Sequence, residues 1–143
     1  MVELNLLHKD LTDLIIQAFY KVYNELGYGF LEKVYENALI IELKKIGLLI
    51  EQQVKIKVFY DETQVGFYLA DLLVESSVIV EIKAAESLGY EHECQLINYL
   101  KASNVEVGLL LNFGKKPTFK RKVFSKKYIR NIIYIINTSY FFI

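Results

Sequence analysis

The chain has 143 residues, of which 53% are hydrophobic and 14% aromatic, and its formal net charge at pH 7 is zero. This length suits one domain with a sizeable core, and the composition excludes a disordered chain. Cys94 is the only cysteine in the sequence. An internal disulfide and a cysteine-based zinc site are therefore excluded.

Two helices are predicted before the first strand. Apolar residues recur with helical spacing over Leu7–Leu26, and Gly27 and Gly29 end that segment. A second helix is expected over about residues 31–46, with Gly47 as its C-terminal stop. The side chains expected to face inward on this second helix are Val34, Ala38, Leu39, Ile41 and Leu43.

Three strands joined by short turns should follow. Leu49–Tyr60 contains an alternation of apolar and other residues that is typical of a strand, and a turn leads into a second strand at Gly66–Glu75. The third strand, Ser77–Ala84, is an almost continuous apolar run that Glu81 and Lys83 interrupt. These two charged residues are two positions apart, so they point to the same face.

One helix and two further strands complete the prediction. Ser87 is expected to cap a helix that runs to about Ser103. Val105–Asn112 is predicted to be a buried strand and Thr118–Phe124 a more exposed one. The predicted order is αα-βββ-α-ββ, which indicates an α/β fold with a mixed β-sheet flanked by helices.

Asp71 and Glu81 are single acids within two apolar strands, and a buried charge is costly unless it is paired or binds an ion. If the intervening turn has three residues, Val74 pairs with Val78 and Asp71 falls opposite Glu81 on one face. Two carboxylates that close repel each other unless a divalent cation lies between them. A two-residue turn would put Asp71 on the wrong face, and an amphipathic hairpin with solvated charges is the alternative interpretation.

The order Asp71, then Glu81-x-Lys83, resembles the core motif of the PD-(D/E)XK nuclease superfamily. This motif alone is common by chance, but other segments support it. Gly29-x-x-Glu32-x-x-Tyr35 resembles the pattern that names the GxxExxY protein family.

The resemblance continues downstream, where Gln95-x-x-x-Tyr99 is similar to a spacing in the exonuclease domains of recombination helicase–nucleases. It covers roughly residues 5–125, with all motifs in the same order. It implies a restriction-endonuclease-like fold more firmly than an activity, because many relatives lack a demonstrated reaction.

The implied activity is metal-dependent hydrolysis of phosphodiester bonds with Mg²⁺ or Mn²⁺. Asp71, Glu81 and the backbone carbonyl of Ile82 would hold the ion, since oxygen ligands suit both metals. Lys83 would orient the attacking water and offset negative charge in the transition state.

Further roles follow from the same resemblance. Glu32 corresponds to the helical acid of superfamily relatives and could hold the metal directly or through water; the alternative is a first-turn acid favoured by the helix dipole. Gln95 and Tyr99, one helical turn apart, could brace the lysine or contact the substrate, or have only a structural role. Tyr35 is expected to be a core aromatic with a hydrogen-bonded hydroxyl. Many relatives carry a metal-binding His where this chain has Tyr23.

Charge is unevenly distributed along the neutral chain, with about −8 up to Glu106 and about +8 after it. A basic segment beside an acidic pocket favours nucleic acid as partner, DNA first and RNA as the alternative. The residues expected to bind the substrate backbone are Lys115, Lys116, Lys120, Arg121 and Lys122. The other interpretations are a solvated C-terminal hairpin, or a catalytically inactive regulatory module that binds nucleic acid or protein.

We expect residues 1–130 to form a single domain and residues 131–143 to be an apolar extension that packs on the domain or on a partner chain. The apolar runs in this extension are too short to span a bilayer, so no membrane partner is expected. Charged residues within Met1–Leu14 argue against a signal peptide, and the cytoplasm is the expected location. A homodimer is an open alternative.

Overall fold

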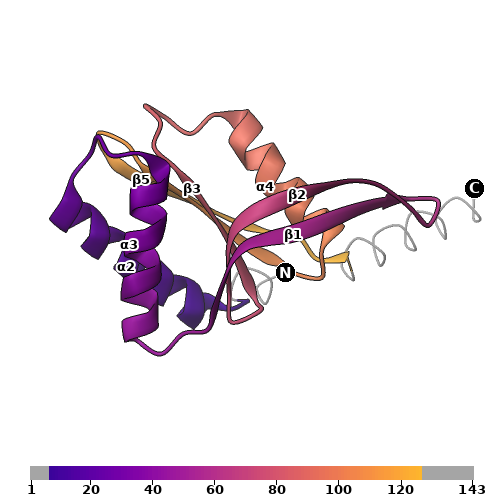
Figure 1. Ribbon diagram of the computed structural model, residues 1–143, viewed down its shortest axis with the longest axis horizontal. Helices are drawn as coiled ribbons and strands as arrows, with labels where there is room; N and C mark the ends of the chain where they lie inside the picture. Colours follow the sequence, from indigo (N-terminus) through magenta and orange to yellow (C-terminus); the bar gives the residue numbers. More distant parts are fainter. Residues whose placement is uncertain (1–6, 127–143) are drawn as a thin grey trace, which may run out of the picture.

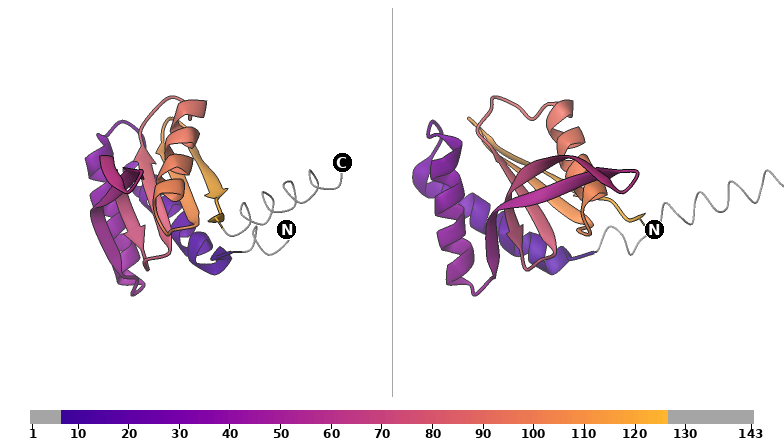
Figure 2. Two further views of the ribbon diagram at one scale, coloured as in Figure 1. Left: turned by 90° about the vertical axis from the view of Figure 1, so that its right-hand side faces the viewer. Right: turned by 45° about the vertical axis from the view of Figure 1, so that its right-hand side comes forward.

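The computed structural model describes residues 7–126. It contains a five-stranded mixed sheet in which α2 and α3 cover one face and α4 covers the other (Figures 1 and 2). The elements are α2 (Lys9–Leu26), α3 (Glu32–Lys45), β1 (Ile50–Tyr60), β2 (Thr63–Val74), β3 (Val78–Lys83), α4 (Tyr90–Ala102), β4 (Val107–Phe113) and β5 (Pro117–Val123). The predicted α/β class and the order αα-βββ-α-ββ are confirmed. The expected extension at 131–143 lies outside the described residues.

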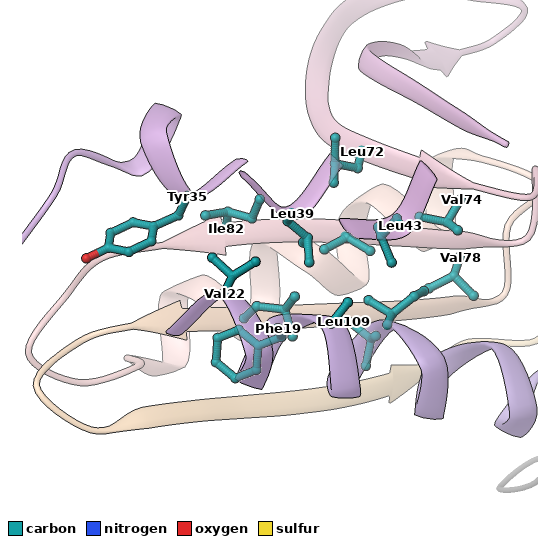
Figure 3. Close-up of a cluster of buried hydrophobic side chains, with 14 of the residues drawn as sticks. Phe19, Val22, Tyr35, Leu39, Leu43, Leu72, Val74, Val78, Ile82 and Leu109 are labelled. Atoms are coloured by element: carbon teal, nitrogen blue, oxygen red, sulfur yellow. The ribbon is translucent and has the colours of Figure 1, made fainter. Parts of the chain in front are cut away.

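The sheet separates two hydrophobic clusters. The larger cluster joins α2 and α3 to one face of the strands, and Figure 3 shows Phe19, Leu39, Leu72 and Leu109 within it. The smaller cluster lies on the other face, where Leu96, Tyr99 and Leu100 of α4 pack on the strands. Alternate residues of β3 divide between the two clusters, as a strand covered on both faces requires.

Helix α3 buries Leu39 and Leu43, as expected, but two other residues that were expected to face inward are exposed. Val34 and Ile41 were expected to face inward, but their exposed fractions are 39% and 56%. The buried apolar residues are Tyr35, Leu39 and Leu43, which recur every four positions and so lie on one face. Val34 and Ile41 lie on a neighbouring face of the helix, about 100° or more around its axis from Tyr35, so the prediction that they face inward was wrong.

Tyr35 closes the loop between α2 and α3 from within the core. Its ring is fully buried and stacks on Phe113, with ring centroids 4.3 Å apart. Its hydroxyl donates to the carbonyl of Gly27 at 2.7 Å and accepts the amide of Phe30 at 3.1 Å. Tyr35 is therefore a core aromatic with a hydrogen-bonded hydroxyl, as expected.

The turn between β2 and β3 has three residues, so Val74 pairs with Val78. Glu75 and Ser76 have φ angles of 52°, in the left-handed region, and the amide of Ser77 donates to the carbonyl of Val74 at 2.9 Å. This tight turn sets the register of the hairpin, and that register is the one that brings Asp71 level with Glu81.

Helix α4 begins later than predicted. Ser87 was expected to be its cap, but the N-cap is Gly89, whose amide donates to Nδ1 of His92 at 3.2 Å. The histidine ring thus accepts a hydrogen bond from the N-cap amide, the role that a Glu or Gln side chain at the third helical position has in a capping box. Over residues 7–126, no helix is both long and apolar enough to cross a membrane.

Candidate active site

Asp71 and Glu81 lie where β2 separates from β3. The paired ladder of these strands ends at Leu72 and Val80. Beyond it, the amide of Asp71 donates to Oε1 of Glu81 at 2.9 Å, and the amide of Ile82 donates to Oδ2 of Asp71 at 2.7 Å. Two carboxylates therefore take the place of backbone carbonyls at the fork between the strands.

The fork coincides with a change of face in the β1–β2 hairpin. Leu72 and Val74 of β2 belong to the larger cluster, but Ala70 belongs to the smaller one beside α4. Opposite this point, Gln53 of β1 has a φ of 53°, in the left-handed region. The hairpin therefore turns from the α3 side toward the α4 side at the level of Asp71, which opens the edge of β3 at Glu81.

The electrostatics of the pair follow from its burial. Burial raises the pKa of Glu81 to about 8, and the negative charge of Asp71 adds to this effect. Burial also raises the pKa of Asp71, while the hydrogen bond from the Ile82 amide opposes the shift. The positive charge of Lys83 lowers the pKa of both acids. The pair is thus a buried site that favours additional positive charge.

Lys83 is half-buried at the end of β3, level with Asn112 of the parallel strand β4. Asn112 is fully buried and holds the chain just after the lysine: its Nδ2 donates to the carbonyl of Ala85 at 3.0 Å, and its Oδ1 accepts the amide of Ala85 at 2.9 Å. These two bonds fix the backbone direction after Lys83. Sequence reasoning missed Asn112, although a polar residue at the end of an apolar strand was a usable signal.

Two acids of α3 act on the carboxylate pair through their charges. Glu32, the expected helical acid, is exposed in the first turn, and its charge raises the pKa of Asp71. Glu36, one turn later, is only 4% exposed, and its charge raises the pKa of both Asp71 and Glu81. Sequence reasoning missed Glu36, although its spacing of four residues from Glu32 was a signal.

Glu36 is held by three side chains. Its carboxylate accepts hydrogen bonds from Lys33, from Gln52 and, at 3.1 Å, from Gln53. Two of these partners belong to β1, at the position where the hairpin changes face. Glu36 therefore links α3 to the bend that opens the site.

Tyr99 of α4 approaches the carboxylate pair. Tyr99 is 4% exposed, and its ring lies 5.3 Å from that of Tyr68 between centroids. Burial, followed by the charges of Glu81 and Asp71, raises the pKa of Tyr99 to about 12. Gln95 is half-buried one turn earlier. The charges of both acids thus act on Tyr99, and the site roles of Tyr99 and Gln95 stay predictions.

The five expected basic residues separate into three groups. Lys115, Lys116 and Lys120 line a groove of 380 Å³ that also contains Glu86. Lys122 forms an ion pair with Glu93 of α4 at 2.6 Å. Arg121 points to the opposite face of β5, where its guanidinium donates to Oγ1 of Thr12 at 3.3 Å and to the carbonyl of Leu7.

The groove of Lys115, Lys116 and Lys120 lies beyond the carboxyl ends of the parallel strands β3 and β4, the edge at which open α/β sheets bind ligands. These three lysines therefore keep a placement that suits substrate binding. Arg121 holds α2 to the sheet, and this engagement gives no support to its expected substrate role.

Tyr23 contacts the β4–β5 turn. Its hydroxyl lies 2.8 Å from the carbonyl oxygen of Gly114 and 2.6 Å from that of Lys115. A phenol hydroxyl in this position stabilises the turn that presents the lysine groove.

The donor set at the fork suits a hard divalent cation. Only one oxygen of each carboxylate is engaged by the backbone bonds, so Asp71 and Glu81 can each offer the other oxygen. Among residues 7–126, no group of three or more His, Cys, Asp or Glu side chains is arranged to hold a metal ion. Two carboxylates, a backbone carbonyl and water match the way in which Mg²⁺ is usually bound, with few protein ligands and several waters.

Residues 9–123 match the model of a family described as the PD-(D/E)XK nuclease superfamily. A comparison with curated proteins gave no significant match. Among solved structures, one titled "Crystal structure of SSO0001" is similar over 81% of this chain and 59% of its own, with 19% sequence identity and a TM-score of 0.50. The chain thus spans about three-fifths of the length of that structure, and the likeness shows the fold alone.

Proposed function

The chain belongs to the PD-(D/E)XK nuclease superfamily, and from this premise we propose that it is a metal-dependent nuclease that hydrolyses phosphodiester bonds of DNA. The observation that carries the proposal is the carboxylate pair at the fork, where Asp71 and Glu81 each accept a backbone amide of the neighbouring strand. The Gly29-x-x-Glu32-x-x-Tyr35 pattern supports placement in the GxxExxY family within this superfamily.

Asp71, Glu81 and the Ile82 carbonyl would hold Mg²⁺ or Mn²⁺, with Glu32 joining through water, because its side chain is exposed at the start of α3. The bound ion supplies positive charge that stabilises the phosphate oxygens and lowers the pKa of a water molecule. Nucleases of this superfamily generally use divalent metals, and the raised pKa values of Asp71 and Glu81 support a site that is completed by a cation.

The remaining steps belong to the side chains of the protein. Lys83 lies on the same side of β3 as Glu81, and its ammonium group would orient the attacking water and offset charge that develops on the phosphate. Tyr99, kept protonated by burial beside the acids, can donate a hydrogen bond to a substrate oxygen. Gln95, one turn earlier on α4, would brace Lys83 or the substrate backbone. Lys115, Lys116 and Lys120 would hold flanking phosphates.

The decisive experiment incubates the purified protein with labelled single- and double-stranded DNA and RNA in Mg²⁺, Mn²⁺ or EDTA. The matched variant is Glu81→Gln, which removes the charge and keeps an acceptor for the Asp71 amide. Cleavage that needs metal and is lost in the variant is the expected result.

Equal cleavage by Glu81→Gln would overturn the proposal, as would an absence of cleavage by the folded wild-type protein under every condition. The groove of Lys115, Lys116 and Lys120 would serve one second candidate equally well. This candidate is an inactive module of the same fold that binds nucleic acid or protein. It predicts salt-sensitive binding that is indifferent to metal.

A further inference from the structure

A groove separates the β1–β2 hairpin from α4. It has a volume of 540 Å³, and it lies where the far ends of β1 and β2 extend past the rest of the sheet (Figure 1). The residues that line it include Lys57 and Phe59 of the edge strand β1, Tyr68 of β2, Asn98 and Lys101 of α4, and Lys126. We call it the hairpin groove; it is distinct from the groove of Lys115, Lys116 and Lys120.

The hairpin groove is basic. Lys57, Lys101 and Lys126 line it, and no Asp or Glu is among its described lining residues. Among residues 7–126 these three lysines form no ion pair within 4.0 Å. Such a surface attracts an anion.

Its aromatic side chains are exposed. Phe59 is 59% exposed and Tyr68 is 44% exposed, although large aromatic side chains normally bury most of their surface. Exposed rings beside lysines are the arrangement by which proteins bind single-stranded nucleic acid, with bases on the rings and phosphates on the cations. A duplex keeps its base faces stacked and offers only phosphates, sugars and base edges.

The groove leads to the acids. Tyr68 precedes Asp71 by three residues, which is about 10 Å along an extended strand. The Tyr68 ring contacts that of Tyr99, and the charges of Glu81 and Asp71 act on the Tyr99 hydroxyl. Asn98 and Lys101 of the groove belong to the same helix as Tyr99. A strand in the groove would therefore pass beside Tyr99 toward the carboxylate pair.

Another occupant of the groove is the rest of this chain, since the described residues end at Lys126. Residues 127–143 contain Lys127 and Arg130 and no acid. The side chains of this segment offer no negative charge to the three lysines, so charge complementarity favours an external anion.

We propose that the hairpin groove binds single-stranded nucleic acid and guides it to the Asp71–Glu81 site. The inference deepens the proposed nuclease function and rests on it for the direction of the strand. Lys57 and Lys101 contact phosphates, and Phe59 stacks on a base.

The test measures fluorescence anisotropy of a labelled oligothymidine and of a duplex of the same length, both in EDTA so that no cleavage occurs. Lys57→Glu and Lys101→Glu should each weaken oligothymidine binding at least tenfold and lower the salt dependence, by about 0.7 in the log–log slope for each phosphate that is no longer neutralised. Phe59→Ala should weaken oligothymidine binding about tenfold and leave duplex binding unchanged. Lys44→Glu, an exposed charge reversal near the end of α3, is the matched control and should have little effect.

Affinities within twofold of wild type for Lys57→Glu and Lys101→Glu would overturn the inference, as would duplex binding as tight as that of the oligothymidine. Thermal unfolding tests whether residues 127–143 of the chain fill the groove instead. A large fall in the melting temperature of Phe59→Ala with unchanged affinity for oligothymidine would mean that they do, and it would overturn the inference. If Lys57→Glu, Lys101→Glu and Phe59→Ala cleave DNA as fast as wild type in the presence of metal, the groove inference is overturned and the nuclease proposal is kept. If the groove variants weaken oligothymidine binding but the wild-type protein cleaves nothing, the groove is a binding site and the nuclease proposal is overturned.

Discussion

Asp71 and Glu81 lie opposite each other on diverging strands, and each carboxylate accepts a backbone amide from the strand of the other. Glu81 Oε1 lies 2.9 Å from the Asp71 amide, and Asp71 Oδ2 lies 2.7 Å from the Ile82 amide. The same two side chains thus repel each other by charge and hold the strands together by hydrogen bonds. The balance between these effects depends on protonation and on a bound cation, and it determines how substitutions act.

The two ways of removing the charge of Glu81 should differ in their effect on stability. Glu81→Gln keeps an acceptor for the Asp71 amide, so without metal its free energy of unfolding should equal or exceed that of the wild type. Glu81→Ala leaves this part-buried amide without its acceptor, which costs about 1–3 kcal/mol. Urea unfolding in EDTA measures both values. Equal stability of the two variants would contradict the hydrogen-bond role.

The stability of the metal-free protein should fall as pH rises because of Glu81. Burial and the charge of Asp71 raise its folded pKa from 4.5 to about 8, so the folded state holds an extra proton between these values. The favourable contribution is complete below pH 4.5 and is lost as pH rises toward 8. Each unit of raised pKa corresponds to about 1.4 kcal/mol, which implies a change on the order of a few kcal/mol.

Other carboxylates have lowered pKa values, such as those of Glu42 and Glu93, and they change stability in the opposite direction. The measurement is therefore the difference between wild type and Glu81→Gln in EDTA, taken at pH 5 and pH 8.5. The variant should gain relative to wild type at the higher pH. A difference that does not change with pH would show that Glu81 is ionised throughout.

The sequence reduced the hairpin register to two alternatives, because the register depends on the length of one local turn. Alternation of apolar residues and a three-residue turn placed Asp71 opposite Glu81, and the structure has this pairing up to Leu72 and Val80. The bend at Gln53 was not predictable in this way, since its positive φ occurs without a glycine or asparagine. The bend depends on the packing of the hairpin against α4. This is a contact between distant segments, which local sequence does not reveal.

The role of Glu36 was hidden for a related reason. Only apolar residues of α3 were predicted to face inward, so the prediction left out Glu36, which the structure buries. Its partners Gln52 and Gln53 come from a strand about 16 residues later, so no local pattern reveals the contact. Likewise, Arg121 donates a hydrogen bond to Thr12 of α2, more than 100 positions earlier in the chain. No local pattern shows that this contact separates Arg121 in space from the other basic residues.

The two acids of α3 should be separable by substitution. Glu36→Gln weakens hydrogen bonds to Lys33, Gln52 and Gln53, and it should lower the free energy of unfolding by about 1–3 kcal/mol. Glu32→Gln changes an exposed side chain and should leave stability within about 0.5 kcal/mol of wild type. If Glu32 supports the metal, this second variant should need more Mn²⁺ for half-maximal cleavage.

Melting temperatures and metal titrations of cleavage, measured on both variants, test this division. An unchanged metal requirement for Glu32→Gln together with a raised one for Glu36→Gln would move the helical acid of the site from Glu32 to Glu36.

Asn112 should act as a positioning residue for Lys83. Asn112→Ala leaves the amide and the carbonyl of Ala85 without their partners, two residues after the lysine, and it should cost about 2–4 kcal/mol of stability. Under the proposed function, kcat should fall more than KM rises, because Lys83 acts on the reacting phosphate and the three groove lysines are all retained. Asn104→Ala, an exposed change of the same kind in the loop before β4, is the control and should alter neither quantity. A purely structural role for Asn112 would lower the melting temperature and leave kcat at wild-type values for the folded fraction.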